Sequence, residues 1–272
     1  MRRFTADYLE RTRRGMWESR EALAPLELAD RTRVLDVGCG TGELTRVLAE
    51  EAPAAEVVGV DADRDLLAAA REATGADAGG DRTAYVAGDA TRLPFPDDAF
   101  DLVACQALLI NLPDPAAAVR EFARVSADSV AAVEPDNADV TVRSTVDAEA
   151  ALEAEVREAY IAGVATDVAM GDRVGDLFAD AGLAGVESRR YRHEKRVDPP
   201  YSGADLEDIA RKASGAGIAD HETELRRELG AAGYDDLRRE WRAMGRSAAE
   251  QAQTGEYERV ETVPFDVTVG RV

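Results

Sequence analysis

The clearest chemical signal is a glycine-rich loop, Asp36-Val37-Gly38-Cys39-Gly40-Thr41-Gly42. It follows a short apolar run that predicts a buried strand at residues 33–37, and it precedes a helical pattern at residues 43–52. Glycines let the backbone turn tightly and approach a ligand closely. In an open α/β sheet, ligands bind beyond the carboxyl ends of the strands. The loop therefore predicts a cofactor site formed by Asp36, Gly38, Cys39, Gly40, Thr41 and Gly42.

The residue types around this loop discriminate among cofactors. A dinucleotide fingerprint ends in Gly or Ala, but counting from Gly38 that position is Glu43. A carboxylate at a helix N-terminus would repel a pyrophosphate. A P-loop requires Gly-Lys-Ser/Thr, and this loop has no lysine. A zwitterionic ligand with a cationic sulfur suits the acidic loop better.

Acidic residues end the next two predicted strands. Asp61, with Ala62 beside it, ends a strand at residues 56–61 and can accept both hydrogen bonds of a ribose diol. A dinucleotide predicts the same residue, and a helix N-cap is the structural alternative. Gly88-Asp89-Ala90 follows a strand at 83–87, where Asp89 can accept from an adenine amino group or form a simple Asx-turn. Gln106, after a fourth strand at 100–105, completes the candidate cofactor site.

These segments resemble the motifs of small-molecule class I S-adenosylmethionine-dependent methyltransferases. Residues 34–42 resemble the first motif and residues 88–103 the third-motif region; the resemblance is strong over 30–136 and weak over 172–193 and 262–272. It implies S-adenosyl-L-methionine as the cofactor, with Gly38 and Gly40 along the methionine part and Asp36 at its ammonium group. Two positions depart from the family pattern. Asn111 stands where His is frequent, and residues 126–129 replace a Lys-Pro-Gly-Gly turn.

Strand and helix patterns alternate over the first half of the chain, which predicts an α/β fold. We expect a Rossmann-like doubly wound sheet of about seven strands, mostly parallel with the last strand antiparallel, plus a helical cap from inserted helices. A single domain over 1–272 would comprise an N-terminal helical lead-in (1–30), a cofactor-binding core (31–136), helical cap segments (144–170 and 201–256) and late strands (186–193 and 262–272).

No strong catalytic constellation is visible, and in-line methyl transfer requires mainly alignment of the reactants. Glu134, Asp136 and Asn137 follow the fifth predicted strand, where one of them could act as a general base; turn carboxylates on an acidic surface are the alternative. Aromatic residues of the later helices could line an acceptor pocket or belong to the core: Tyr160, Tyr201, Tyr234 and Trp241. Tyr8 and Trp17 of the lead-in could close over the cofactor. His193 is expected to be structural or exposed.

The net charge of −21 disfavours non-specific nucleic-acid binding. Only two of the 33 Lys and Arg residues are lysines, a bias that resembles proteins of halophilic archaea. The two cysteines and two histidines lack the spacing of a disulfide framework or a metal site, so no metal is expected. No membrane span or signal peptide is apparent, and we expect a cytoplasmic protein.

The expected function is methyl transfer to a small-molecule acceptor, such as a quinone, a lipid or a polyketide-like compound. Three alternatives stay open: a non-catalytic S-adenosylmethionine-binding protein, an NAD(P)-dependent oxidoreductase and an RNA methyltransferase.

Overall fold

The computed structural model describes residues 4–75 and 82–272, and its contacts divide the chain into two compact units. The first unit comprises Met1–Pro135, Met170–Tyr191 and Phe265–Val272, and the second comprises Asp136–Ala169 and Arg192–Pro264. Neither unit is one continuous segment, because the chain passes back and forth between them. The single domain expected over residues 1–272 stays a prediction. Residues 75–81 are rich in Gly, Ala and Asp, which predicts a loop, and all of them after Gly75 lie outside the described residues.

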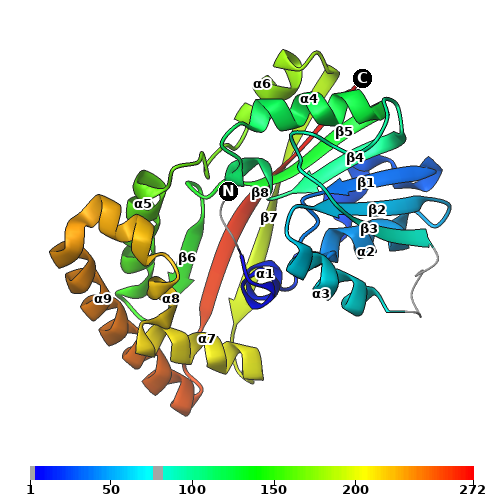
Figure 1. The fold of residues 1–272 in the computed structure, drawn as a ribbon. Coiled ribbons are helices and arrows are strands. Elements are labelled where there is room, and N and C mark those ends of the chain that lie inside the picture. Colours follow the sequence, from blue (N-terminus) through cyan, green and yellow to red (C-terminus); the bar gives the residue numbers. More distant parts are fainter. Residues whose placement is uncertain (1–3, 76–81) are drawn as a thin grey trace. The chain divides into compact units, whose positions relative to one another are not determined.

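The first unit is built on a mostly parallel sheet (Figure 1). Its parallel strands are ordered β3-β2-β1-β4-β5. Their bounds are β1 Arg33–Val37, β2 Glu56–Asp61, β3 Thr83–Ala87, β4 Phe100–Gln106 and β5 Ser126–Pro135. β8 (Arg259–Arg271) lies antiparallel to β5, and β7 (Ala184–Val197) pairs with β8. This arrangement confirms the predicted doubly wound fold with an antiparallel last strand.

The central strands are buried on both faces because their alternate side chains enter different cores. On β1, Leu35 and Val37 join the cluster that contains Phe122 of α4 (Pro115–Val125) and Phe178 of α6 (Arg173–Asp180). Val34 joins the opposite cluster, with Leu48 of α2 (Glu43–Glu51). Such double burial explains the continuous apolar runs in the sequence. α3 (Arg64–Thr74) begins after Asp63, whose side chain caps it.

The lead-in departs from the sequence prediction. α1 spans Ala6–Arg13, but residues 16–28 do not form the α-helix expected in a helical lead-in over residues 1–30. Two short 3-10 turns, η1 (Glu21–Leu26) and η2 (Leu28–Asp30), take its place. Pro25 lacks an N–H for a helical hydrogen bond, and Glu27 between the turns has a left-handed φ of 52°. The apolar spacing instead buries Leu23 and Leu26 against the sheet's α2 side.

The second unit is mainly helical. It contains α5 Glu149–Gly163, α7 Gly203–Ser214, α8 Ala216–Ala219 and α9 Glu222–Thr254, the last kinked at Gly230. A short strand that the sequence prediction missed, β6 (Thr141–Ser144), pairs with the first half of β8. Tyr234 and Trp241 are buried in this unit's core, with Tyr160 and Tyr201 packed against it. No helix within the described ranges is long and apolar enough to cross a membrane.

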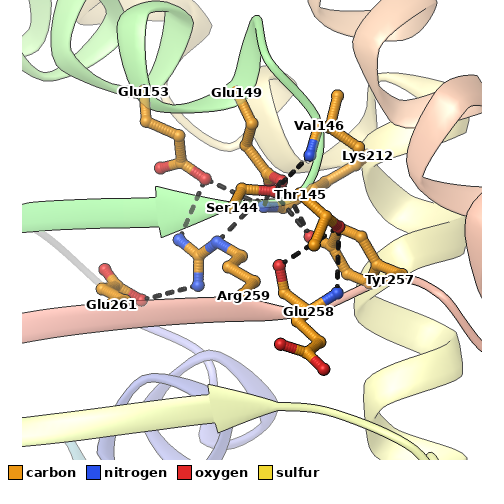
Figure 2. Close-up of polar contacts among 10 residues, drawn as sticks. All are labelled: Ser144, Thr145, Val146, Glu149, Glu153, Lys212, Tyr257, Glu258, Arg259 and Glu261. Atoms are coloured by element: carbon orange, nitrogen blue, oxygen red, sulfur yellow. Dashed lines mark hydrogen bonds and ion pairs between the residues drawn. The ribbon is translucent and has the colours of Figure 1, made fainter.

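A buried ionic cluster ties α5, α7 and β8 together in the second unit (Figure 2). Glu149 is fully buried, pairs with Lys212 and Arg259, and accepts from the Tyr257 hydroxyl at 2.9 Å. Glu153 accepts from the same two cations at 2.9 Å each. Burial alone would raise the pKa of Glu153, but Lys212 and Arg259 lower it to about 2. These charges are therefore mutually dependent, because each carboxylate compensates two cations that are themselves largely buried.

We expect Glu149→Ala to lower the free energy of unfolding by about 3–5 kcal/mol, since Lys212, Arg259 and the Tyr257 hydroxyl would each lose one buried partner. Urea denaturation at neutral pH measures the change. Glu158→Ala, at an exposed position of the same helix, is the matched control and should shift stability by less than about 0.5 kcal/mol. Equal effects of the two substitutions would show that the cluster adds nothing beyond an ordinary helix residue.

Candidate functional site

The glycine loop lies at the carboxyl end of β1 in a conformation that only glycine adopts readily. Gly38, Gly40 and Gly42 have φ of 72°, 56° and 74°. A Cβ on Gly38 would lie 2.7 Å from Leu108 Cδ1, and a Cβ on Gly42 would collide with the Tyr85 hydroxyl. The loop is thus closely packed as well as left-handed. Cys39 contributes a buried side chain, and the Thr41 carbonyl accepts from Arg46 at 2.8 Å.

Asp61 connects the glycine loop to the next strand. One of its carboxylate oxygens accepts from the Gly40 N–H at 2.8 Å, and the other accepts from the Asp63 N–H at 2.8 Å. The carboxylate is 8% exposed. Each carboxylate oxygen can accept more than one hydrogen bond, so these contacts leave acceptor capacity for a hydroxyl group. Asp61 itself is not a helix N-cap, because Asp63 caps α3.

Asp36 is buried beneath the loop rather than displayed on it. Its side chain is 1% exposed and accepts from the Thr45 hydroxyl at 2.6 Å. Burial raises the pKa of Asp36 to about 6, opposed by the Thr45 hydrogen bond and the positive charge of Arg13. The expected contact of Asp36 with an ammonium group stays a prediction.

The loop after β3 carries an exposed carboxylate. Asp89 Oδ1 accepts from the backbone and side chain of Thr91, both at 2.8 Å, and these bonds lower its pKa. The Asx-turn considered as the alternative is therefore present, and the second oxygen remains available for a ligand. The Gly88 N–H donates to the Asp61 carbonyl at 3.0 Å, which ties the start of this loop to the end of β2. A Cβ at Gly88 would lie 2.8 Å from Val60 Cγ2.

Gln106 at the end of β4 is buried under the lead-in. Its Oε1 accepts from the Trp17 indole N–H at 3.3 Å, and its amide nitrogen lies 2.7 Å from Met16 Sδ. Trp17 belongs to the core cluster on the α2 side of the sheet. The role expected for Trp17, closing over the cofactor, and that of Gln106 in binding it stay predictions.

Glu134 at the end of β5 is fully buried, so it is not a surface turn carboxylate. It accepts from the backbone N–H groups of Leu108 and Leu109 at 2.9 and 2.8 Å, and thereby holds the turn η4 (Leu109–Asn111) against the sheet. Burial raises the pKa of Glu134 to about 7 despite these donors. The carboxylate is thus engaged with backbone, and general-base action by Glu134 stays a prediction.

The remaining candidates belong to the second unit. Asp136 accepts from the Ala138 N–H at 3.2 Å, and the Asn137 side chain donates to the Val168 carbonyl at 2.6 Å. His193 lies on β7 and is half-buried. Tyr234 and Trp241 are core residues, as the alternative interpretation expected.

The segment that contains the glycine loop is similar to a known protein family. Residues 35–130 match a family model described as a methyltransferase domain. The match implies S-adenosyl-L-methionine as the cofactor. It includes the glycine loop, the ends of β2, β3 and β4, and η4.

Curated relatives are similar to part of this chain. A demethylmenaquinone methyltransferase of Thermus thermophilus is 42% identical over 111 residues, which is 41% of this chain and 49% of that protein. The enzyme of the same name from Lactiplantibacillus plantarum is 40% identical over 107 residues, 39% of this chain and 45% of that protein. The matched region therefore spans about half the length of these relatives.

Solved structures extend the likeness to the whole fold. The YcgJ protein of Bacillus subtilis has a TM-score of 0.55 at 19% identity, covering 93% of this chain and 98% of that one. A Bacillus halodurans protein has a TM-score of 0.52 at 19% identity, covering 93% and 99%. At this identity, the similarity establishes the fold alone.

The residues of the matched segment fit the implied cofactor. Gly38 and Gly42 leave no room for a side chain, and Asp61 presents acceptor oxygens at the strand ends. Sequence reasoning missed one neighbour of the loop: α1 packs on Gly40 through Leu9 and Arg13. The four-residue spacing of these two side chains on a predicted helix was the available signal.

Glu134 should make stability depend on pH. Its pKa is raised to about 7 from an ordinary 4.5, so its stabilising contribution is complete below pH 4.5 and is lost as pH rises through about 7. Between about pH 5 and pH 8, the free energy of unfolding of the unsubstituted protein should fall by about 2–3 kcal/mol more than that of Glu134→Gln. Asp36 titrates in both proteins, so the difference isolates Glu134. Chemical denaturation across this range tests it, and parallel profiles would contradict the raised pKa.

Proposed function

We propose that this protein is an S-adenosylmethionine-dependent methyltransferase acting on a small-molecule acceptor. One observation carries the proposal. The segment that matches the methyltransferase-domain model contains the glycine loop, and the Gly40 N–H of this loop donates to the Asp61 carboxylate. S-adenosylmethionine, when bound, supplies a methyl group already activated by a cationic sulfur.

The chain's own residues would act by binding and orientation. Gly38, Gly40 and Gly42 bring backbone close to the methionine part, Asp61 accepts from the ribose hydroxyls, and Asp89 accepts from the adenine amino group. Asp36 lies below the loop, where its negative charge favours an ammonium group above it. These roles need no catalytic side chain, because alignment of the two reactants is the main requirement for an in-line displacement.

A groove in the second unit supports a small-molecule ligand. It has a volume of about 720 Å³, within the usual range for ligand pockets, and lies between α5 and α9. Val146, Leu152 and Met244 give it an apolar floor, while its charged lining residues are all carboxylates: Asp147, Glu155 and Glu240. This lining favours an uncharged or cationic organic molecule over an anion. The quinone named for the curated relatives falls within this class.

The cofactor assignment is tested by isothermal calorimetry with S-adenosylmethionine and NAD. We expect binding of S-adenosylmethionine, and a loss of at least tenfold in affinity for Asp61→Ala, since a carboxylate that accepts hydrogen bonds from the ligand is removed. Circular dichroism must confirm that the variant is folded. Tighter binding of NAD would favour an oxidoreductase, and unchanged affinity in the variant would refute the ribose role of Asp61.

The transfer itself is tested by incubating the protein with methyl-labelled S-adenosylmethionine and a panel of naphthoquinols, phenols, amines and transfer RNA. We expect labelled product from a small organic molecule. Labelled RNA would favour the RNA methyltransferase alternative. Cofactor binding without any product across the panel would favour a non-catalytic binding protein.

The groove is tested with the apolar fluorescent dye N-phenyl-1-naphthylamine. Ala151→Trp fills the groove and should abolish enhancement of dye fluorescence, without changing affinity for S-adenosylmethionine. Ala154→Trp, an exposed position of the same helix outside the groove lining, is the matched control and should bind dye normally. Equal dye binding by both variants would place the apolar site elsewhere.

A further inference from the structure

The proposed cofactor site has an imbalance of charge. Its side chains supply carboxylates: Asp36, Asp61 and Asp89. S-adenosylmethionine carries a carboxylate as well as an ammonium group and a sulfonium. A carboxylate that leaves water needs hydrogen-bond donors, and a cation provides the strongest ones. The carboxylate of S-adenosylmethionine therefore calls for a positively charged side chain near the loop.

α1 brings one arginine to the glycine loop. Leu9 and Arg13 are four residues apart, so they lie on the same face of this helix. Leu9 Cδ1 lies 3.0 Å, and Arg13 Nη1 3.8 Å, from the position that a Cβ on Gly40 would take. Leu9 is buried there. It anchors α1 so that the Arg13 guanidinium reaches the loop backbone.

The Arg13 guanidinium makes no direct polar contact at this position within the described part of the chain. Across residues 4–75 and 82–272 its guanidinium forms no hydrogen bond or ion pair. Two other arginines near the loop are engaged: Arg46 donates to the Thr41 carbonyl, and Arg20 pairs with Glu50 and Glu51. The positive charge of Arg13 also opposes the effect of burial on Asp36 and Glu43, whose pKa values it lowers. Arg13 is thus a half-buried cation above Gly40 with its donors unused.

We propose that Arg13 binds the carboxylate of the methionine part of S-adenosylmethionine and selects for cofactors that carry it. The inference rests on the proposed function. A guanidinium can donate two parallel hydrogen bonds to a carboxylate, which gives direction as well as charge. α1 is then part of the cofactor site, and the lead-in helps to define which sulfonium nucleoside the protein accepts.

The test compares ligands with and without the carboxylate. Calorimetry measures the affinity of the unsubstituted protein, Arg13→Ala and Arg11→Ala for S-adenosylmethionine, decarboxylated S-adenosylmethionine and 5′-methylthioadenosine. Arg11 lies on the same helix, with its guanidinium over the Tyr8 ring, so its removal is the matched loss of one positive charge. Thermal melts followed by circular dichroism establish that each variant is folded.

We expect Arg13→Ala to weaken S-adenosylmethionine binding by about 10- to 100-fold, the loss typical for hydrogen bonds between charged groups. Binding of 5′-methylthioadenosine should be unchanged, and binding of decarboxylated S-adenosylmethionine unchanged or tighter, because Arg13 would no longer repel this cation. Arg11→Ala should leave all three affinities within about twofold.

Two results would overturn the assignment while leaving the proposed function intact. If Arg13→Ala weakened all three ligands equally, Arg13 would act only by supporting the loop. If it changed none of them, α1 would lie outside the site. A wild-type protein that binds none of the three ligands would overturn the proposed function as well, so the two failures are distinguishable.

Discussion

The last two residues of β2 organise the edge of the sheet on which the candidate site depends. The Val60 carbonyl accepts from the N–H groups of Gly38 and Cys39 at 2.7 and 3.1 Å, and the Asp61 carbonyl accepts from Gly88 at 3.0 Å. The Asp61 carboxylate adds the N–H of Gly40. Loops that follow β1 and β3 are thereby fixed to one strand end. A parallel sheet brings these ends together, and these hydrogen bonds set the distances between them.

Burial separates the roles of carboxylates that look alike in the sequence. Asp36, Asp61 and Glu134 each lie at or near a strand end, yet Glu134 is fully buried and engaged with the backbone of η4. By holding that turn, Glu134 keeps Leu108 against Gly38, so it supports the loop from the neighbouring strand. Asp61 retains some exposure and unused acceptor capacity. The carboxylates at these strand ends therefore have different roles. Glu134 is structural, whereas Asp61 can still accept a hydrogen bond from a ligand.

Much of the first unit follows from local sequence because its strands are buried on both sides and its loops need glycine. Periodicity predicted β1 to β5, and the glycine spacing predicted the cofactor loop. The 3-10 turns around Pro25 and Glu27 were missed because the apolar pattern did not register the breaks at these residues. β6 is four residues long and exists through pairing with β8, a contact distant in sequence. The proximity of Arg13 to the glycine loop was not predicted, because it depends on where α1 packs.

The central claim is that the glycine loop at residues 36–42 binds S-adenosylmethionine. Amide hydrogen exchange with and without this ligand tests the claim most directly. Because the Gly38, Gly40 and Gly88 amides are tied to β2, a ligand that bridges these loops should slow their local opening. We expect slower exchange in residues 36–42, 61–63 and 88–91 on adding S-adenosylmethionine, with exposed segments of α9 unchanged. Protection confined to other segments, or no protection at a saturating concentration, would contradict the claim.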